Sequence, residues 1–236
     1  MCRMIAALSS KPLRSESLKP FEILAAKGKI RSDMTEPGHC DGWGMTAYLK
    51  EDVPEYIERQ PTALPGDSDL FHKALQWMET SGVRNAMIHL RKSTEGAKSI
   101  SNTHPFLHGR WSFCHNGTIY DSGRIPLQKL ATSGTTDSER FFLYLMENLS
   151  RFLPAEWSLR KSIARVKKMV SYSSLTFLLS DGSKLYAYRD CDPRFEEYYT
   201  LYSSRTPDGQ FVCSEPLPSV SRAWESLPNG TLITLR

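Results

Sequence analysis

The stretch Met1-Cys2-Arg3-Met4-Ile5-Ala6-Ala7-Leu8 places a cysteine second in the chain and a continuous apolar run directly after it. Cysteine is small enough for the preceding methionine to be trimmed, which would leave a thiol and a free α-amine on one residue. Their usual pKa values are about 8.5 and about 7.7–8.0, so the amine can act as base for the thiol. We therefore interpret Cys2 as a candidate nucleophile heading a buried strand, Arg3–Leu8. The alternative is an ordinary cysteine that follows Met1 by chance.

The composition is that of a globular protein. Of 236 residues, 40% are hydrophobic and 24% charged, and the formal charge is +4. The densest basic stretch, residues 160–168, has helical spacing and indicates a solvated helix face, so we expect no nucleic-acid partner. The apolar run after Cys2 is too short for a signal sequence or a membrane span. Five scattered cysteines indicate no disulfide framework. We therefore expect a cytoplasmic protein without membrane contact.

The order of the expected elements favours an α+β fold. Strands dominate both ends, helices lie near the start and in the middle, and βαβ alternation is missing, which argues against a parallel sheet. We expect two antiparallel sheets packed together with helices outside, in one domain over residues 1–236. The expected strands are 3–8, 42–48, 55–59, 85–90, 111–114, 118–120, 174–179, 184–188, 196–201, 210–213 and 231–235, and the expected helices lie at 20–27, about 68–78, 137–149 and about 155–170.

Two charged residues at element ends are candidates for holding a charged ligand. Arg91 follows the apolar strand Asn85–Leu90 and enters a long polar loop. Its planar guanidinium suits a carboxylate, and the alternative is an ion pair at the surface. Asp137 stands at the expected start of a helix, where its carboxylate could bind an ammonium group. The alternative there is helix capping by Thr136-Asp137-Ser138-Glu139 alone.

Two glycine-containing stretches are candidates for a close approach of backbone to ligand. In His115-Asn116-Gly117, the Asn116 amide and the Gly117 backbone N–H could form an oxyanion hole, or the pair could be a plain turn. In Asp41-Gly42-Trp43-Gly44, the glycines indicate a strand beside another backbone or a ligand, or a bulge with a core tryptophan.

No metal or organic cofactor is expected. A zinc site would need ligands from His39, Cys40, Cys114 and His115. Neighbouring residues on a strand point to opposite faces, and these pairs lack the usual short ligand spacing, which disfavours the site.

Seven short stretches occur in a recognisable order along the chain: Met1-Cys2-Arg3, Asp41-Gly42-Trp43-Gly44, His89-x-Arg91-x-x-Thr94-x-Gly96, Asn102-Thr103-His104-Pro105-Phe106, His115-Asn116-Gly117, Thr136-Asp137-Ser138-Glu139 and Ser214-Glu215-Pro216. Together they resemble the class II glutamine amidotransferases, which are N-terminal-nucleophile hydrolases, and among them the stand-alone YafJ-like and EgtC-like branch. The resemblance implies a four-layer αββα sandwich of two antiparallel sheets. It covers nearly the whole chain, so we expect no synthetase domain.

The resemblance also implies a role for each matching residue. Cys2 would be the thiol nucleophile with its own α-amine as base, and Asn116 and Gly117 would be the oxyanion donors. Ser214-Glu215 would pack behind the nucleophile. The residues implied for substrate binding are Arg91 for the α-carboxylate, Thr94 near the same end, Asp137 for the α-ammonium group, and Gly42 and Trp43 as pocket lining.

The substrate implied is glutamine, whose ammonia could pass to a separate synthase subunit. Arg91-Lys92-Ser93-Thr94-Glu95 differs from the Arg-Trp-Ala-Thr-His of the sugar-phosphate synthesising members, so their mobile lid is not implied. Lys92 and Glu95 could instead contact a different γ-amine substituent. The alternatives are therefore a hydrolase of γ-glutamyl amines or peptides, and a catalytically silent subunit that binds a glutamyl ligand.

Overall fold

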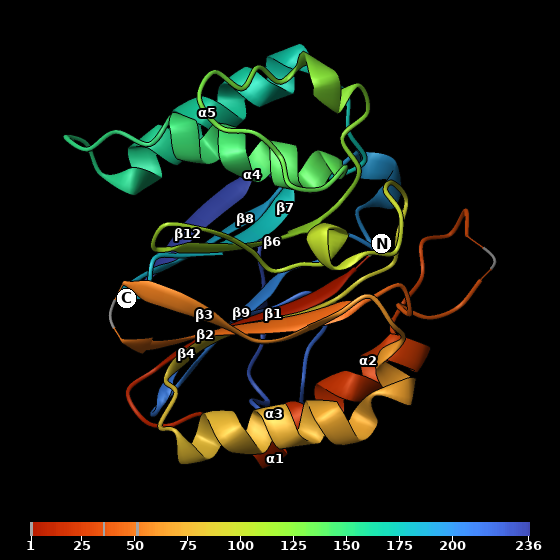
Figure 1. The fold of residues 1–236 in the computed structure, drawn as a ribbon, viewed down its shortest axis with the longest axis vertical. Helices are drawn as coiled ribbons and strands as arrows, with labels where there is room; N and C mark the ends of the chain where they lie inside the picture. Colours follow the sequence, from red (N-terminus) through yellow and green to blue (C-terminus); the bar gives the residue numbers. More distant parts are fainter. Residues whose placement is uncertain (1, 35, 51) are drawn as a thin grey trace.

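Two stacked β-sheets form the centre of the molecule, with helices on both outer faces (Figure 1). The structure is a computed structural model that describes residues 2–34, 36–50 and 52–236. The paired strands within each sheet are antiparallel. This is the four-layer αββα architecture that the sequence motifs imply.

The first sheet has β1 (Arg3–Ser9) at its centre. Its strand order is β11-β9-β10-β1-β4-β2-β3. Met4 and Ala6 of β1 face the layer between the two sheets, whereas Ile5 and Ala7 face the helices. Both faces of β1 are buried, which explains its continuous apolar run. The other strands are β2 (Trp43–Lys50), β3 (Val53–Gln60), β4 (Asn85–Leu90), β9 (Tyr202–Thr206), β10 (Gly209–Cys213) and β11 (Glu225–Ser226).

The second sheet has the strand order β12-β8-β7-β6-β5. Leu178 and Ala187 of this sheet pack against Met4 and Ala6 of the first, so the interior layer joins the two sheets. The strands are β5 (Phe106–His108), β6 (Trp111–Asn116), β7 (Thr176–Ser180), β8 (Leu185–Arg189) and β12 (Thr231–Leu235).

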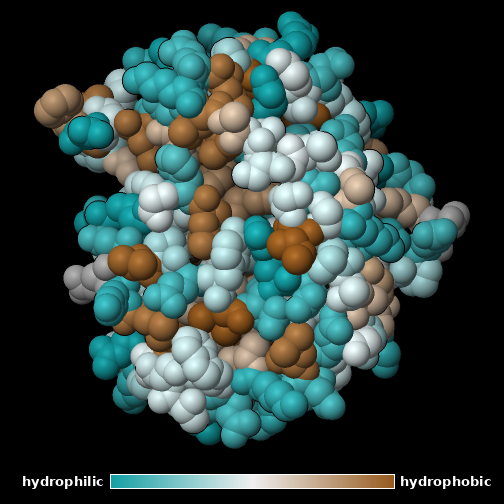
Figure 2. Space-filling model, in the orientation of Figure 1, coloured by the Kyte–Doolittle hydropathy of each residue, from teal (hydrophilic) through white to brown (hydrophobic). Residues whose placement is uncertain are grey.

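The helices lie on the two outer faces (Figure 1). Figure 2 shows a largely hydrophilic surface on this side, with hydrophobic side chains gathered around the upper helices. Among the described residues, no helix is both long and apolar enough to cross a membrane. The first sheet is covered by α1 (Ser15–Leu18), α2 (Ile23–Lys27) and α3 (Ser68–Thr80), the second by α4 (Asp137–Glu147) and α5 (Ala155–Met169), and short 3₁₀ turns are η1 (Lys19–Glu22), η2 (Leu64–Gly66), η3 (Ile100–Asn102), η4 (Ser122–Arg124) and η5 (Pro193–Phe195).

Two predicted strands are wrong. Residues 196–201 do not form a strand, because Pro193 fixes a turn just before them. Asp192 caps this turn by accepting a hydrogen bond from the Arg194 backbone N–H at 2.9 Å. The strand begins only at Tyr202. Residues 118–120 form a single bridge, Ile119 with Tyr172. The predicted strand 85–90 has the same bounds in the structure.

Candidate active site

Cys2 lies at one end of the first sheet, directly before β1, and is buried. In the antiparallel register Arg3 lies opposite Leu90, the last residue of β4, and Leu90 lies opposite Trp43, the first residue of β2. The start of β1, the end of β4 and the start of β2 therefore meet at one edge. This brings Cys2, Arg91 and Gly42, which are far apart in sequence, to the same end of the sheet.

Asn116 ends β6 in the second sheet and contacts Cys2 directly. The backbone nitrogen of Cys2 donates a hydrogen bond to Asn116 Oδ1 at 2.9 Å. Asn116 Nδ2 is buried and has no hydrogen-bond partner among the described residues. A buried amide donor without a partner is costly, so this group is suited to an acceptor brought by a ligand. Removal of Met1, which lies outside the described residues, would turn the Cys2 nitrogen into an α-amine.

Gly117 follows Asn116 at a point where no side chain fits. A Cβ atom built there would lie 2.0 Å from the carbonyl oxygen of Ser174. The close approach of this second chain segment fixes the turn after β6. The turn places the backbone of Gly117 directly after Asn116, whose Nδ2 has no hydrogen-bond partner among the described residues.

Arg91 is buried, not a surface residue as the simpler alternative held. Its guanidinium donates hydrogen bonds to the carbonyl oxygens of Glu95 at 2.9 Å and Gly96 at 3.2 Å, and to Ser93 Oγ at 3.0 Å. It has no ion pair with a carboxylate among the described residues, so its charge is not neutralised. The loop after β4 is thus folded around a buried positive charge. The Arg91 backbone N–H donates to the carbonyl of Gly42 at 2.8 Å, which ties Gly42 to the same edge.

Thr94 connects this loop to the turn that follows β6. Its Oγ1 lies 2.7 Å from Thr118 Oγ1, a hydrogen bond between the two hydroxyl groups. The Thr118 backbone N–H in turn donates to Ser173 Oγ at 2.9 Å. Thr94 therefore lies between the Arg91 loop and the Asn116 turn.

Asp137 is the first residue of α4 and is buried. Thr136 provides the cap, because its Oγ1 accepts a hydrogen bond from the Glu139 backbone N–H at 3.2 Å. Asp137 Oδ2 instead accepts from the Ile119 backbone N–H at 2.7 Å. Burial raises the pKa of the Asp137 carboxyl, while the hydrogen bonds from Ile119 and Ser138 oppose that shift. Asp137 has no cationic partner among the described residues, so a cation that bound here would stabilise its charged form.

The side chain of Trp43 does not join this cluster. It is fully buried and packs edge-on against Phe71 of α3, with ring centres 5.7 Å apart. Its Nε1 donates to Asp67 Oδ2 at 2.9 Å. The indole therefore lies between the first sheet and its helices, as the core alternative held, and only the backbone near Gly42 reaches the edge that carries Cys2.

His115 was singled out only as an unlikely zinc ligand, yet it links the parts of the site. Its Nε2 lies 3.0 Å from the Ser174 carbonyl, which can only accept, so Nε2 donates the hydrogen bond. Its Nδ1 lies 2.8 Å from Ser138 Oγ. Burial lowers the pKa of His115 to about 4. The neutral ring thus joins the segment beneath Gly117 to the start of α4. The His-Asn-Gly sequence gave no signal of this, because Ser138 and Ser174 are remote in the chain.

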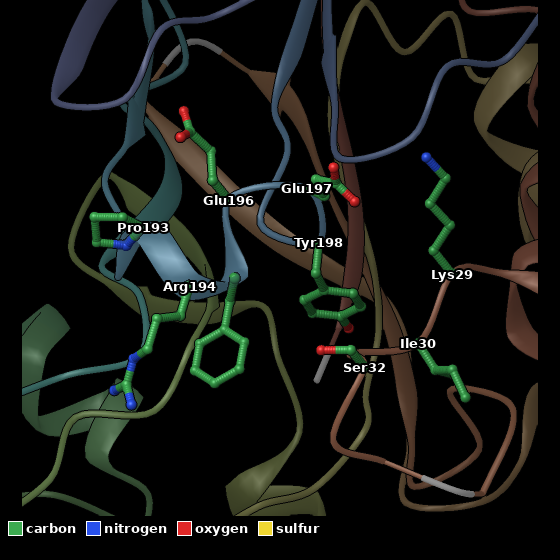
Figure 3. Close-up of a pocket in the computed structure, with 9 residues that line it drawn as sticks. Lys29, Ile30, Ser32, Pro193, Arg194, Glu196, Glu197 and Tyr198 are labelled. Carbon is green, nitrogen blue, oxygen red and sulfur yellow. The ribbon is translucent and has the colours of Figure 1, made fainter.

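A cavity of about 500 Å³ opens beside this cluster (Figure 3). Its walls are Lys29, Ile30 and Ser32 on one side and residues 193–198 on the other. Tyr198, labelled in Figure 3, belongs to the second wall, and its ring packs against the Arg3 guanidinium at 4.7 Å. Cys2 does not line the cavity, which is therefore a neighbour of the site.

Comparison with known proteins identifies the family. The sequence matches the family described as "Glutamine amidotransferases class-II" over residues 1–207. This chain belongs to that family. The matched residues include those that meet at the start of β1, from Cys2 to Asp137, and continue through β9.

This chain aligns with only part of the length of its curated relatives. The chain is 30% identical over 158 residues to a glutamine amidotransferase named in Haemophilus influenzae, with 64% of this chain and 52% of the relative aligned. It is 28% identical over 159 residues to the glutamine amidotransferase named YafJ in Escherichia coli, with 64% and 60% aligned. The matches thus span about half to three fifths of these relatives.

A solved structure shows the same fold. The glutamine aminotransferase class-II domain protein from Silicibacter pomeroyi superposes with a TM-score of 0.65, covering 99% of this chain and 94% of that chain at 21% identity. The two-sheet architecture with helices outside is therefore the class II amidotransferase fold.

Proposed function

We propose that this chain hydrolyses the γ-glutamyl amide bond of glutamine, with Cys2 as the nucleophile once Met1 has been removed. The observation that supports this best is the 2.9 Å hydrogen bond from the Cys2 nitrogen to Asn116 Oδ1. It joins the candidate nucleophile and base to the residue whose Nδ2 has no other partner. Membership of the amidotransferase family fits the same chemistry.

The reaction would proceed through a thioester. The α-amine of Cys2 takes the thiol proton, and the thiolate attacks the γ-carbonyl carbon of glutamine. The tetrahedral oxyanion accepts hydrogen bonds from Asn116 Nδ2 and the Gly117 backbone N–H. The C–N bond then breaks, and the departing nitrogen takes a proton from the α-ammonium group to leave as ammonia. Water, deprotonated by the same amine, hydrolyses the thioester to glutamate. The ammonia would serve a separate synthase, in keeping with the transfer for which the family is named.

Two buried charges supply recognition of the free glutamyl end. Arg91 carries an unneutralised positive charge at the end of β4, suited to the α-carboxylate. Asp137 carries a carboxylate without a cationic partner among the described residues, suited to the α-ammonium group. Thr94, in the loop after Arg91, is hydrogen-bonded to Thr118, the neighbour of the Ile119 that donates to Asp137. A glutamyl group would thus neutralise two charges that are otherwise expensive to bury.

The direct test combines intact mass with active-site labelling. The mature protein should lack the mass of one methionine residue, and a glutamine-like diazoketone should add once, at Cys2, with loss of glutaminase activity. Excess glutamine should protect Cys2 from the reagent. Labelling at another residue, or retention of Met1 in the active protein, would overturn the proposal.

A second candidate function is the hydrolysis of γ-glutamyl compounds with a larger leaving amine. It is favoured by the loop after Arg91, because the carbonyl of Lys92 lies 3.8 Å from Cys2 Sγ and this residue could contact the substituent of a larger amine. Turnover of glutamine should be compared with that of γ-glutamyl amides of bulky amines. A much higher kcat/KM for the bulky amides would favour this function over the first.

We also propose that residues 1–236 act as one domain. Support comes from the interior layer, in which Met4 of the first sheet packs with Leu178 and Leu185 of the second. Limited proteolysis that released a stable fragment containing only one sheet would contradict this.

A further inference from the structure

Arg3, the first residue of β1, is a buried charge with an unusual set of partners. Its exposed fraction is 1%. Nη1 donates a hydrogen bond to the backbone carbonyl of Cys2 at 3.1 Å, and Nη2 donates to the carbonyl of Lys29. The guanidinium also lies over the ring of Tyr198, 4.7 Å from its centre. A guanidinium is buried only where partners replace its water, so these contacts make a specific position for Arg3.

Glu215 provides the countercharge. Its Oε2 lies 2.9 Å from Arg3 Nε, and the same oxygen accepts a hydrogen bond from the Lys29 backbone N–H at 3.2 Å. The preceding Ser214 is fixed to β1, because its Oγ accepts from the Met4 backbone N–H at 3.0 Å and its own N–H donates to the Met4 carbonyl at 2.9 Å. Hydrogen bonds to Lys29 and through Ser214 therefore hold the Arg3–Glu215 pair in place next to Cys2.

The two members of the pair are not equivalent with respect to Cys2. The Arg3 guanidinium contacts the Cys2 carbonyl through Nη1, whereas the Glu215 carboxylate contacts Arg3 at Nε and has no hydrogen bond to Cys2 among the described residues. Coulomb energy falls with distance, so the positive charge acts on Cys2 more strongly than the negative charge does. A nearby positive charge disfavours an ammonium group and favours a thiolate.

We propose that Arg3 and Glu215 are a positioning pair for the nucleophile. Arg3 holds the carbonyl of Cys2, which sets the direction of the amine and thiol of that residue, and its excess charge favours the unprotonated amine. This rests on the proposed function, since that mechanism requires the amine as base.

Among the other titratable groups around Cys2 in the described part of the chain, none donates a side-chain hydrogen bond to that residue, as Arg3 does. Burial raises the pKa of Cys114, Tyr198 and Tyr199, which stay neutral near pH 7, and burial lowers the pKa of His89 to about 3, so it is also neutral. Arg91 and Lys92 are cationic, but their side chains donate elsewhere: Arg91 to loop carbonyls, and Lys92 Nζ to the carbonyl of Glu36 at 3.2 Å. Asp137 accepts a hydrogen bond from the Ile119 backbone N–H, and burial raises the pKa of its carboxyl.

If Arg3 and Glu215 act in this way, two variants should shift the pH dependence of kcat/KM for glutamine in opposite directions. In Arg3→Gln the acidic limb should move to higher pH by about half to one unit, because the amine gains a proton more easily. In Glu215→Gln it should move to lower pH, because the guanidinium charge is no longer offset. Arg3→Lys keeps the positive charge but lacks the planar guanidinium group. The acidic limb of its pH profile should therefore stay at the wild-type pH, while kcat should fall.

Three measurements keep the result interpretable. Intact mass shows whether each variant has lost Met1, and thermal unfolding shows whether it folds. The pH dependence of Cys2 alkylation by iodoacetamide reports formation of the thiolate without substrate, which the same positive charge favours. Lys27→Gln, which removes an exposed charge at the end of α2, should behave as wild type.

The proposal would be overturned if the acidic limb of the pH profile stayed at the wild-type pH in Arg3→Gln and Glu215→Gln, or if it moved in the same direction in both variants. If Arg3→Gln does not fold, Glu215→Gln and Arg3→Lys decide it. Wild-type protein that neither turns over glutamine nor is labelled at Cys2 would instead refute the proposed function.

Discussion

The backbone of Gly117 lies so close to Ser174 that a Cβ atom at residue 117 would be 2.0 Å from the Ser174 carbonyl oxygen. Ser174 is also the acceptor for His115 Nε2 at 3.0 Å. One carbonyl therefore excludes a side chain from the turn and fixes the histidine that precedes it. The turn after β6 is therefore defined by Ser174, which lies 57 residues after Gly117 in the chain.

Gly117→Ala should damage both folding and activity. The added methyl group meets backbone, which cannot rotate away, so we expect a loss of unfolding free energy of about 1–3 kcal/mol or more. Chemical denaturation measures it, and kcat should fall as the turn shifts. Gly123→Ala is the matched control, since nothing lies within 4 Å of its Cβ position. Equal stability of the two variants would contradict this account.

Asn116→Asp should lower kcat by about 10²–10³-fold, the usual cost of losing one oxyanion donor. The substitution keeps an acceptor for the Cys2 nitrogen but replaces the Nδ2 donor with an oxygen. Steady-state kinetics with glutamine tests it, with diazoketone labelling to show that Cys2 remains accessible. A variant with near wild-type kcat would exclude Asn116 Nδ2 from the mechanism.

Asp137→Asn should weaken substrate binding and stabilise the free protein at neutral pH. Loss of a charged hydrogen bond to the ammonium group raises KM about 10–100-fold. Burial raises the pKa of Asp137 in the fold, so its ionisation costs stability as pH rises through that pKa. The gain from Asn should therefore appear near pH 7 and vanish below the unfolded carboxyl pKa. Unfolding curves of both proteins at pH 3.5 and pH 7, without substrate, decide the sign.

Acid should destabilise the fold through its buried histidines. Burial lowers the pKa of His115 to about 4 and of His89 to about 3, and that of His104 well below its usual value. Below about pH 6.5 the unfolded chain binds protons that the fold excludes, so each histidine removes about 1.4 kcal/mol per pH unit until its folded pKa is reached. Denaturation at pH 5, 6 and 7 measures the slope. His104→Leu should flatten it, and an unchanged slope would count against the explanation.

Trp43→Phe should lower stability and leave KM unchanged. The indole packs on Phe71 and donates to Asp67 Oδ2, so the variant loses packing volume and one hydrogen bond, together about 1–3 kcal/mol. Asp67→Asn, which keeps an acceptor for Nε1, should lose less. A large rise in KM with unchanged stability would place Trp43 in the substrate site after all.

The sequence by itself determined the nucleophile candidate, the two-sheet architecture and most of the strands, because these depend on local patterns. The run after Cys2 is apolar at every position, which requires a strand buried on both faces, and Thr136 and Glu139 have the spacing of a helix cap. The prediction of a strand at Glu196–Leu201 was wrong. It relied on the apolar residues of that stretch, whereas the turn at Pro193, which Asp192 caps, precedes it in the structure.

Only the tertiary structure decided which side chains meet. Trp43 and Gly42 are neighbours in sequence, yet the indole packs against a helix, whereas Gly42 precedes β2 and is tied to the edge by the hydrogen bond from the Arg91 backbone N–H to its carbonyl. Arg3 is about two hundred residues away from Tyr198 and Glu215 in the sequence, and it meets both because β1 is the central strand of its sheet. Contacts between remote segments depend on strand order and register, and no local pattern of residues encodes those.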